Sequence, residues 1–189
     1  MPEGPEVRKF ADALDAALTG RAIVSFEART KEARKWSFCA GCSNTKTKPI
    51  GAALLNQSIV AGLGNYLRAE VLFSCKLNPW RTVGELTQRN LNCLSITISR
   101  LTRDAYERGA TAADEDRKRM ASDPSLVYQP GREYGTRHLV FRRTNLPCLR
   151  CGEKIRQLRQ KTMQNQDDQE ERTRIVYFCA TCQKVEAAD

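Results

Sequence analysis

The sequence predicts a mainly α-helical chain with a small β-structured part near its C-terminal end. Segments 49–79 and 87–108 repeat apolar residues every three or four positions, as helices do. Two pairs of closely spaced cysteines enclose segments 155–159 and 174–178, which suit the two strands of a hairpin. We expect four parts: a helix and a strand at 1–36, a junction at 37–48, a helical domain at 49–137 and a cysteine-bearing domain at 138–189.

The charge of the chain favours a polyanionic partner. Its 189 residues include 31 Lys and Arg against 22 Asp and Glu, a formal net charge of +9. Nucleic acid is the first expectation for such a chain and an anionic membrane surface the second. No run of 18 apolar residues is present, and the charged N-terminus lacks a signal-peptide core, so we expect an intracellular protein without a membrane span. Eight cysteines in that compartment favour metal binding over a disulfide framework.

Segment 49–79 predicts two helices joined by a glycine-containing turn. The first helix is expected to run through Leu54 and Leu55, and the second to open near Asn65. Pro79 marks the latest end of the second helix. One face of that helix is apolar at i, i+4 and i+8, through Leu63, Leu67 and Val71.

The start of the second helix is a candidate phosphate site. Gly62 and Gly64 would let a partner approach the backbone closely. The N–H groups of a helix start attract an anion, and Asn65 adds a side-chain donor. A plain turn is the alternative, because glycine before a helix is common.

The N-terminal stretch MPEGPEV combines a helix start with a candidate nucleophile. If the initiator Met is removed, Pro2 exposes a secondary amine whose pKa of ~8 leaves part of it unprotonated at neutral pH. Such an amine can attack an aldehyde carbon and form a Schiff base. Glu3 and Glu6 would then move protons beside it. The alternative is an ordinary helix start, with prolines and acidic residues at its positive end.

The middle of the chain predicts one long helix followed by a polar connection. Apolar residues recur three and four apart from Thr87 to Arg108, and Gly109 suits the helix end. Residues 112–136 are polar and contain two prolines, which indicates a mobile connection.

The C-terminal part predicts a metal site. The pattern C-x2-C-x27-C-x2-C can hold a tetrahedral Zn²⁺, and four thiolates leave no open position, so the metal would be structural. The ligands would be Cys148, Cys151, Cys179 and Cys182. The polar middle of the spacer suits an extended hairpin tip. A second pair, Cys39 and Cys42, is half a zinc site, a redox pair or an incidental part of the junction.

Three stretches resemble one protein family. LLNQSIVAGLGNYLRAEVLF is similar to the helix–two-turn–helix of the formamidopyrimidine-DNA glycosylase/endonuclease VIII family, MPEGPEV to its N-terminal head, and LVFRRTNLPCLRCG to the entry into its zinc finger. We expect the chain to be close in sequence to the endonuclease VIII-like branch of this family. The resemblance implies that Gly64 and Asn65 bind a phosphate of the damaged strand. Arg174, five residues before Cys179, would contact phosphates that flank the lesion.

For the chemistry, the resemblance implies Pro2 as nucleophile, Glu3 as the residue that protonates the opened sugar, and Glu6 in support. The implied protein is a monomer that stays with the DNA of its compartment. It would act on damaged double-stranded DNA as a base-excision glycosylase and abasic-site lyase, with one structural Zn²⁺ as its cofactor.

The sequence departs from the family pattern at two places. The family has a much longer β-rich stretch after the position of Trp36, so segment 1–36 would be a truncated catalytic-domain remnant. Arg142 and Asn145 stand where glycine, or histidine for Arg142, is common. Two alternatives stay open: a catalytically impaired DNA-binding remnant of the family, and a zinc ribbon of the translation machinery, which would leave MPEGPEV unexplained.

Overall fold

The computed structural model describes residues 46–56, 60, 62–130, 133–162 and 173–185. All of them belong to one unit, Lys35–Asp189. The predicted helix and strand of segment 1–36 lie outside the described residues, as do Pro2, Glu3 and Glu6. The same holds for Cys39 and Cys42.

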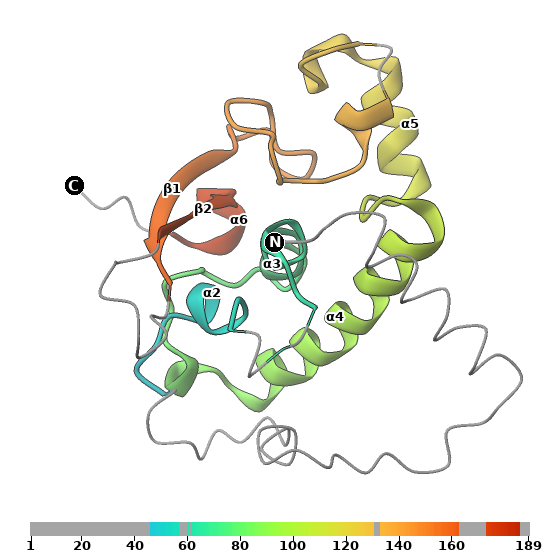
Figure 1. Ribbon diagram of the computed structural model, residues 1–189. Helices are drawn as coiled ribbons and strands as arrows, with labels where there is room; N and C mark the ends of the chain where they lie inside the picture. Colours follow the sequence, from blue (N-terminus) through green and yellow to red (C-terminus); the bar gives the residue numbers. More distant parts are fainter. Residues whose placement is uncertain (1–45, 57–59, 61, 131–132, 163–172, 186–189) are drawn as a thin grey trace, which may run out of the picture. The chain divides into compact units, whose positions relative to one another are not determined.

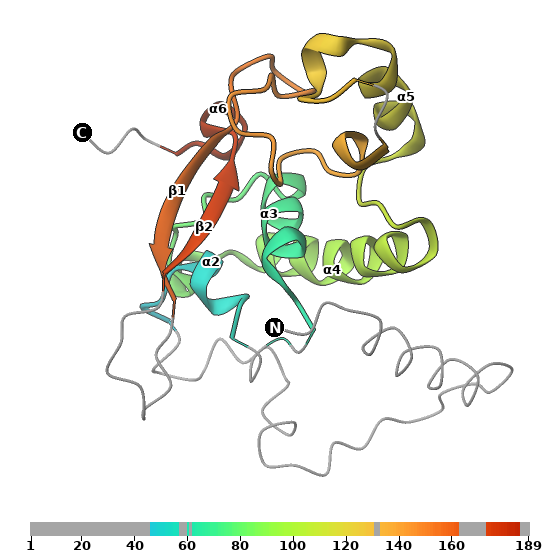
Figure 2. The ribbon, with the colours of Figure 1, turned by 45° about the horizontal axis from the view of Figure 1, so that its top comes forward.

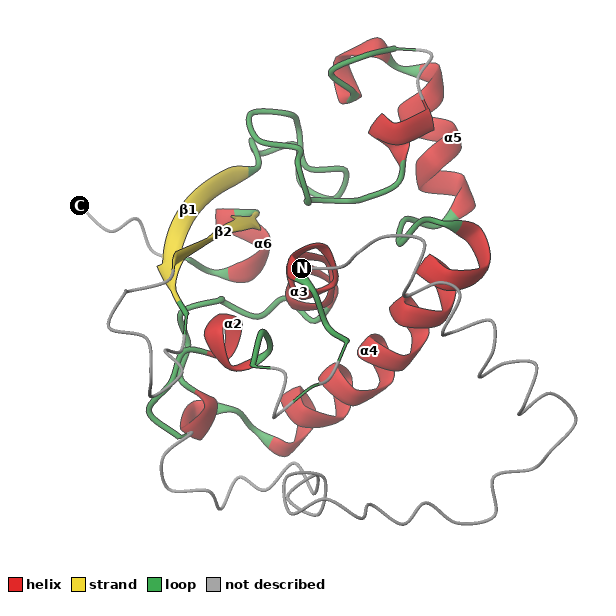
Figure 3. Ribbon diagram, in the orientation of Figure 1, coloured by secondary structure: helices red, strands yellow, loops and turns green. Residues whose placement is uncertain are grey.

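The described part of the chain is mainly helical and carries one small sheet (Figure 3). In chain order its elements are α2 (Ile50–Ala53), α3 (Asn65–Ser74), the 3₁₀ helix η2 (Val83–Glu85), α4 (Gln88–Arg108), α5 (Asp114–Ser122), the 3₁₀ helices η3 (Pro124–Leu126) and η4 (Glu133–Thr136), β1 (Arg156–Lys161), β2 (Thr173–Phe178) and α6 (Ala180–Gln183).

The apolar face predicted for α3 is confirmed. Its stripe packs in a core cluster with Ile50 of α2 and with Leu94 and Leu101 of α4. Leu67 and Val71 of α3 are nearly inaccessible to solvent, and so is Leu63, which lies just before the helix begins. Burial of such side chains contributes about 1.5–3 kcal/mol each, so this cluster fixes α3 against α4.

Helix α3 is buried on a second face as well. Figures 1 and 2 both show it between α4 and the part of the chain formed by β1, β2 and α6. Ala69 and Phe73 pack there with Val140, Ile155 and Cys179. As a result every residue from 67 to 73 is buried, including two charged ones.

The ends of α4 agree with the sequence prediction. Thr87 caps its start, because its side chain accepts a hydrogen bond from the Asn90 backbone, and the Asn90 side chain accepts one from the Thr87 N–H. Gly109 ends the helix with a φ of 61°, a left-handed conformation that glycine adopts at little cost.

Two predicted features are wrong in detail. The first helix ends at Ala53, and Leu54 and Leu55 form the turn after it. Segment 112–136 is not a simple connection, because it contains α5, η3 and η4. The acidic first turn of α5 suits the positive end of a helix. Met120 secures the segment by packing in a small cluster with Ala112, Leu126, Val127 and Leu149.

Strands β1 and β2 form the predicted hairpin as an antiparallel pair, with Arg156 opposite Phe178 and Lys161 opposite Thr173. The first strand starts one residue later than expected and extends to Lys161. The hairpin lies beside α2 and α3. Ile175 of β2 accepts a hydrogen bond from Asn65 at the start of α3, and Gln160 of β1 accepts one from Arg68.

Cys75, just after α3, forms a disulfide with Cys93 of α4, and their Cα atoms lie 5.9 Å apart. The expectation of metal binding in place of disulfides is therefore wrong for this pair. Within the described residues, no helix combines the length and the apolar character needed to cross a membrane.

Candidate nucleic-acid interface and metal centre

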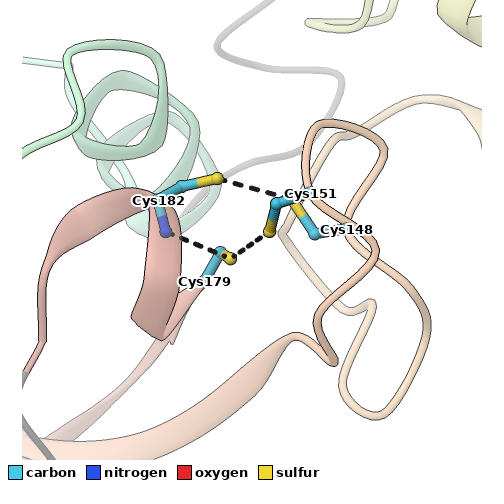
Figure 4. A group of neighbouring side chains, drawn as sticks. All are labelled: Cys148, Cys151, Cys179 and Cys182. Carbon is cyan, nitrogen blue, oxygen red and sulfur yellow. Dashed lines mark hydrogen bonds between the residues drawn. The ribbon is translucent and has the colours of Figure 1, made fainter.

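The four cysteines predicted as metal ligands come together at one point (Figure 4). Their Sγ atoms all lie within 4.8 Å of one another. The Sγ atoms of Cys148 and Cys182 are 3.9 Å apart, and those of Cys151 and Cys179 are 3.4 Å apart. A tetrahedral ion with Zn–S bonds of about 2.3 Å needs separations of about 3.8 Å, so this set fits such an ion.

Local turns hold the first cysteine pair in place. The Cys148 N–H donates to the Glu153 carbonyl at 2.8 Å, and Gly152 adopts a φ of 78°. Arg142 and Asn145 have φ values of 56° and 65°. Both values are left-handed, a conformation that glycine adopts more easily than arginine or asparagine.

Burial makes two of the four thiols harder to ionise. Burial raises the pKa of Cys179, and it raises the pKa of Cys182 to about 11. Without a cation both thiols would therefore hold their protons at neutral pH. A divalent metal binds thiolates, so binding would release these protons.

The start of α3 is open to an anion. Gly64 is the N-cap, no side chain caps the helix, and its first turn holds no acidic residue. Gly64 has an extended backbone, which any residue can adopt. The turn requires glycine at Gly62 instead, where φ is 77°. The positive end of the helix dipole is thus left without a counter-charge from its own first turn.

Asn65 links this helix start to the hairpin. Its Nδ2 donates to the Ile175 carbonyl of β2 at 3.1 Å, although the two residues are 110 positions apart. Its Oδ1 accepts a bond of 2.6 Å from Arg68 Nη2. The neighbour of Ile175 is Arg174, whose side chain is exposed and makes no hydrogen bond or ion pair within the described ranges.

Arg68 and Arg174 concentrate positive charge beside Asn65. Arg68 is fully buried, and each of its hydrogen-bond acceptors is neutral. Burial, and then the charge of Arg174, lower the pKa of Arg68 to about 10. Two guanidinium groups near each other, with neutral partners only, favour an anion between or beside them.

Glu70 has a different role on the same helix. Its carboxylate accepts backbone N–H bonds of 2.8–2.9 Å from Leu139, Val140 and Phe141, and a bond of 3.2 Å from the Thr111 hydroxyl. It therefore fixes the chain that enters the cysteine-bearing part. Backbone N–H groups occupy this carboxylate, and Glu70 is not among the hydrogen-bond acceptors of Arg68.

Sequence reasoning missed Arg68 and Glu70. A usable signal existed for Arg68, because a residue three positions after Asn65 shares its helix face. Of the predicted DNA-binding residues, the structure brings Asn65 and Arg174 to one place, with Gly64 at the adjoining helix start. The predicted catalytic residues lie outside the described residues.

Comparison with known proteins gives consistent matches. A family model described as the formamidopyrimidine-DNA glycosylase H2TH domain matches residues 25–116. Formamidopyrimidine-DNA glycosylase of Thermus thermophilus is 30% identical over 136 residues, which are 72% of this chain and 45% of that protein. The corresponding protein of Streptococcus agalactiae is 33% identical over 116 residues, 61% of this chain and 39% of that protein. The chain thus spans less than half the length of these curated relatives.

Solved structures agree on the fold. The MutM (Fpg) protein of Thermus thermophilus superposes with a TM-score of 0.52 at 29% identity, over 75% of this chain and 47% of that one. A Lactococcus lactis Fpg variant in complex with DNA containing Fapy-dG also gives a TM-score of 0.52, at 26% identity, over 73% of this chain and 44% of that one.

Proposed function

Because the chain belongs to the formamidopyrimidine-DNA glycosylase/endonuclease VIII family, we propose that it binds damaged double-stranded DNA and acts in base excision repair. The observation that carries this proposal is the meeting of Asn65, Arg68 and Arg174 at the uncapped start of α3. A phosphodiester bound there would meet one free Nδ2 hydrogen of Asn65 and the exposed guanidinium of Arg174.

The electrostatics of this site suit a phosphate better than a carboxylate-bearing protein partner. The positive helix end, the buried Arg68 and the exposed Arg174 act together on one small region. A phosphate offers several acceptor oxygens for donors from two elements at once, and it relieves the repulsion between the two guanidinium groups. Binding should therefore be independent of base sequence and sensitive to salt.

For the metal centre, we propose one structural Zn²⁺ held by Cys148, Cys151, Cys179 and Cys182. Their separations suit tetrahedral thiolate coordination. The ion would fix the two turns that carry the cysteines relative to β2. It would thereby support the placement of Arg174, which lies in the strand that leads into Cys179.

For the reaction, we propose that the Pro2 amine adds to C1′ of a flipped-out nucleotide while the bond to the base breaks. The sugar ring then opens as the C1′–O4′ bond breaks and O4′ takes a proton from Glu3, which leaves an iminium between Pro2 and C1′. The iminium loses a C2′ proton, which eliminates the 3′ phosphate, and a second elimination frees the 5′ phosphate. Hydrolysis then restores the amine. Glu3 would protonate the opened sugar and Glu6 would support the site.

A second candidate is a DNA-binding member of the family with impaired catalysis. It is favoured by the short stretch between Trp36 and α2, where the resemblance to the family implies a much longer β-rich segment. Base excision needs a pocket for the flipped base, whereas an opened abasic sugar already exposes its aldehyde. We therefore expect abasic-site lyase activity to exceed glycosylase activity in this chain.

The binding part of the proposal is tested by fluorescence anisotropy with a duplex that contains a tetrahydrofuran abasic analogue. Asn65→Ala and Arg174→Ala should each weaken binding and flatten the plot of log affinity against log salt by ~0.9 for each lost contact. Arg103→Ala removes an exposed charge from α4 and is the matched control for Arg174→Ala. Equal losses in that control would mean that general charge, and not this site, binds the DNA.

The catalytic part is tested by borohydride trapping on abasic-site DNA. A live enzyme forms a covalent complex that disappears when the N-terminus is blocked by a retained Met1 or a tag. Glu3→Gln should spare the imine and stop base removal. Salt-sensitive binding without any trapping would favour the DNA-binding candidate over the enzyme.

A further inference from the structure

Arg68, beside the proposed phosphate site, is fully buried and donates four hydrogen bonds. Its Nη1 donates to the Gly51 carbonyl at 3.3 Å and to Gln160 Oε1 at 3.4 Å. Its Nη2 donates to Asn65 Oδ1 at 2.6 Å and to the Ile175 carbonyl at 2.7 Å. Since each Nη carries two hydrogens, the outer fork of the guanidinium is fully used. Four parts of the chain, α2, α3, β1 and β2, therefore meet at one side chain.

The partners of Arg68 include both elements that carry the proposed phosphate ligands. The Ile175 carbonyl accepts from Arg68 Nη2 and from Asn65 Nδ2 together. Arg174 immediately precedes that carbonyl in β2, and Gln160 lies opposite Arg174 in the hairpin. One guanidinium thus sets where the helix ligand and the strand ligand stand relative to each other.

Arg68 also fixes the orientation of the Asn65 amide. An arginine only donates hydrogen bonds, and a carbonyl only accepts them. Asn65 must therefore turn Oδ1 to Arg68 and Nδ2 to Ile175. That orientation leaves the second Nδ2 hydrogen available to a phosphate oxygen, and a flipped amide would offer no such donor.

Burial of Arg68 for packing alone would be unfavourable in free energy. A fully buried guanidinium without a carboxylate partner is expensive, and its Nε has no hydrogen-bond partner within the described residues. An apolar residue of similar size would fill the same volume without that cost. The contacts to Asn65 and to the backbone beside Arg174 supply a reason to keep the charge.

We propose that Arg68 is a positioning residue for DNA binding, which acts through Asn65 and Arg174 and does not itself touch the phosphates. This inference rests on the proposed DNA-binding function. The ligand is a phosphodiester, and Arg68 acts on it only indirectly. The geometry of the arginine side chain matters beyond its charge. Lysine keeps the charge but offers a single ammonium with three donors and no planar fork, so it cannot serve all four acceptors.

The test measures the affinity of the full chain for the abasic-analogue duplex at about 50–200 mM salt. Arg68→Lys should weaken binding at least about tenfold, the range expected when hydrogen bonds to a charged group are lost. It should also flatten the salt dependence, although no exposed charge has been removed. In the Asn65→Ala/Arg174→Ala background, the same Arg68→Lys change should alter the affinity by less than about twofold, because nothing remains to be positioned.

The results that would overturn the inference are specific. Wild-type affinity in Arg68→Lys would show that the fork is not needed. An equal loss in both backgrounds would show a direct contact or a general disturbance of the fold. If the unmodified chain does not bind the duplex at all, the proposed function itself fails, which is a different outcome from failure of the Arg68 role alone.

Should Arg68→Lys lose its zinc or its cooperative melting, Asn65→Asp tests the same contact with Arg68 intact. A carboxylate in place of the amide would pair with the buried guanidinium, so the melting temperature should rise while the affinity for the duplex falls at least about a hundredfold. A melting temperature that does not rise would contradict the contact on which the inference depends.

Discussion

Asn65→Asp should raise the stability of the fold and weaken DNA binding. The new negative charge pairs with Arg68 but repels a phosphate at the proposed site. In the native chain, Arg68 Nη2 lies 2.6 Å from Asn65 Oδ1. The guanidinium is buried and none of its hydrogen-bond acceptors is charged. The substitution supplies a carboxylate at the same distance with almost no change in volume.

The size of the effect follows from three contributions. A hydrogen bond between two charged partners contributes up to about 3 kcal/mol, and it replaces a bond from the charged guanidinium to a neutral amide, which contributes at least about 1.5 kcal/mol. The substitution also removes the 3.1 Å bond from Asn65 Nδ2 to Ile175, which costs about 1 kcal/mol. The net gain is about 0.5 kcal/mol, which corresponds to a rise in melting temperature of about 1–2 °C for a chain of this length.

DNA binding changes in the opposite direction. The carboxylate has no hydrogen to donate and repels the phosphate, so we expect a loss of at least about 2.7 kcal/mol in binding free energy, or about a hundredfold in Kd. Calorimetry and anisotropy on the same preparations measure the two effects. Asn92→Asp, on the exposed side of α4, changes the net charge equally and is the control. A variant that melts at or below the wild-type temperature and still binds DNA normally would refute the reasoning.

Three further results are expected. Cys148→Ser and Cys179→Ser should each lose the bound Zn²⁺ in metal analysis, and full retention in both would contradict the proposed ligand set. Glu70→Gln should lower the free energy of unfolding by about 3 kcal/mol, since the buried carboxylate accepts several backbone bonds; exposed Glu107→Gln should change it by less than about 0.5 kcal/mol. Burial lowers the pKa of His138, so the unfolded chain takes up a proton more readily and stability falls as pH drops through about 6.5. Melting temperatures between about pH 7.5 and 5.5 should show this fall, and His138→Gln should reduce it.

Features that depend on neighbours along the chain could be predicted from the amino-acid sequence alone. The spacing of Leu67 and Val71, with Leu63 just before the helix, predicts the face of α3 that packs on α4, and Thr87 and Gly109 define the two ends of α4. Each of these follows from a period of about 3.6 residues or from a cap, which are local properties. The two cysteine pairs could likewise be grouped from their spacing alone.

Other features could not be obtained from local pattern. The predicted connection at 112–136 contains α5, because Met120 packs in a small core that also includes Leu149, 29 residues further along the chain. Cys75 and Cys93 pair because α3 and α4 lie side by side, and their spacing in sequence gives no sign of it. Here tertiary packing overrides local composition.

The burial of the charged residues in α3 depends entirely on tertiary contacts. Arg68 and Glu70 would face water in an isolated helix, because burying a charge is favourable only where other elements supply its hydrogen bonds. The hairpin and α2 supply acceptors to Arg68, and the chain at 139–141 supplies donors to Glu70. These partners come from distant parts of the sequence. Only the tertiary fold brings them around α3, and only then does the predicted helix start become a charged site shared by α3 and β2.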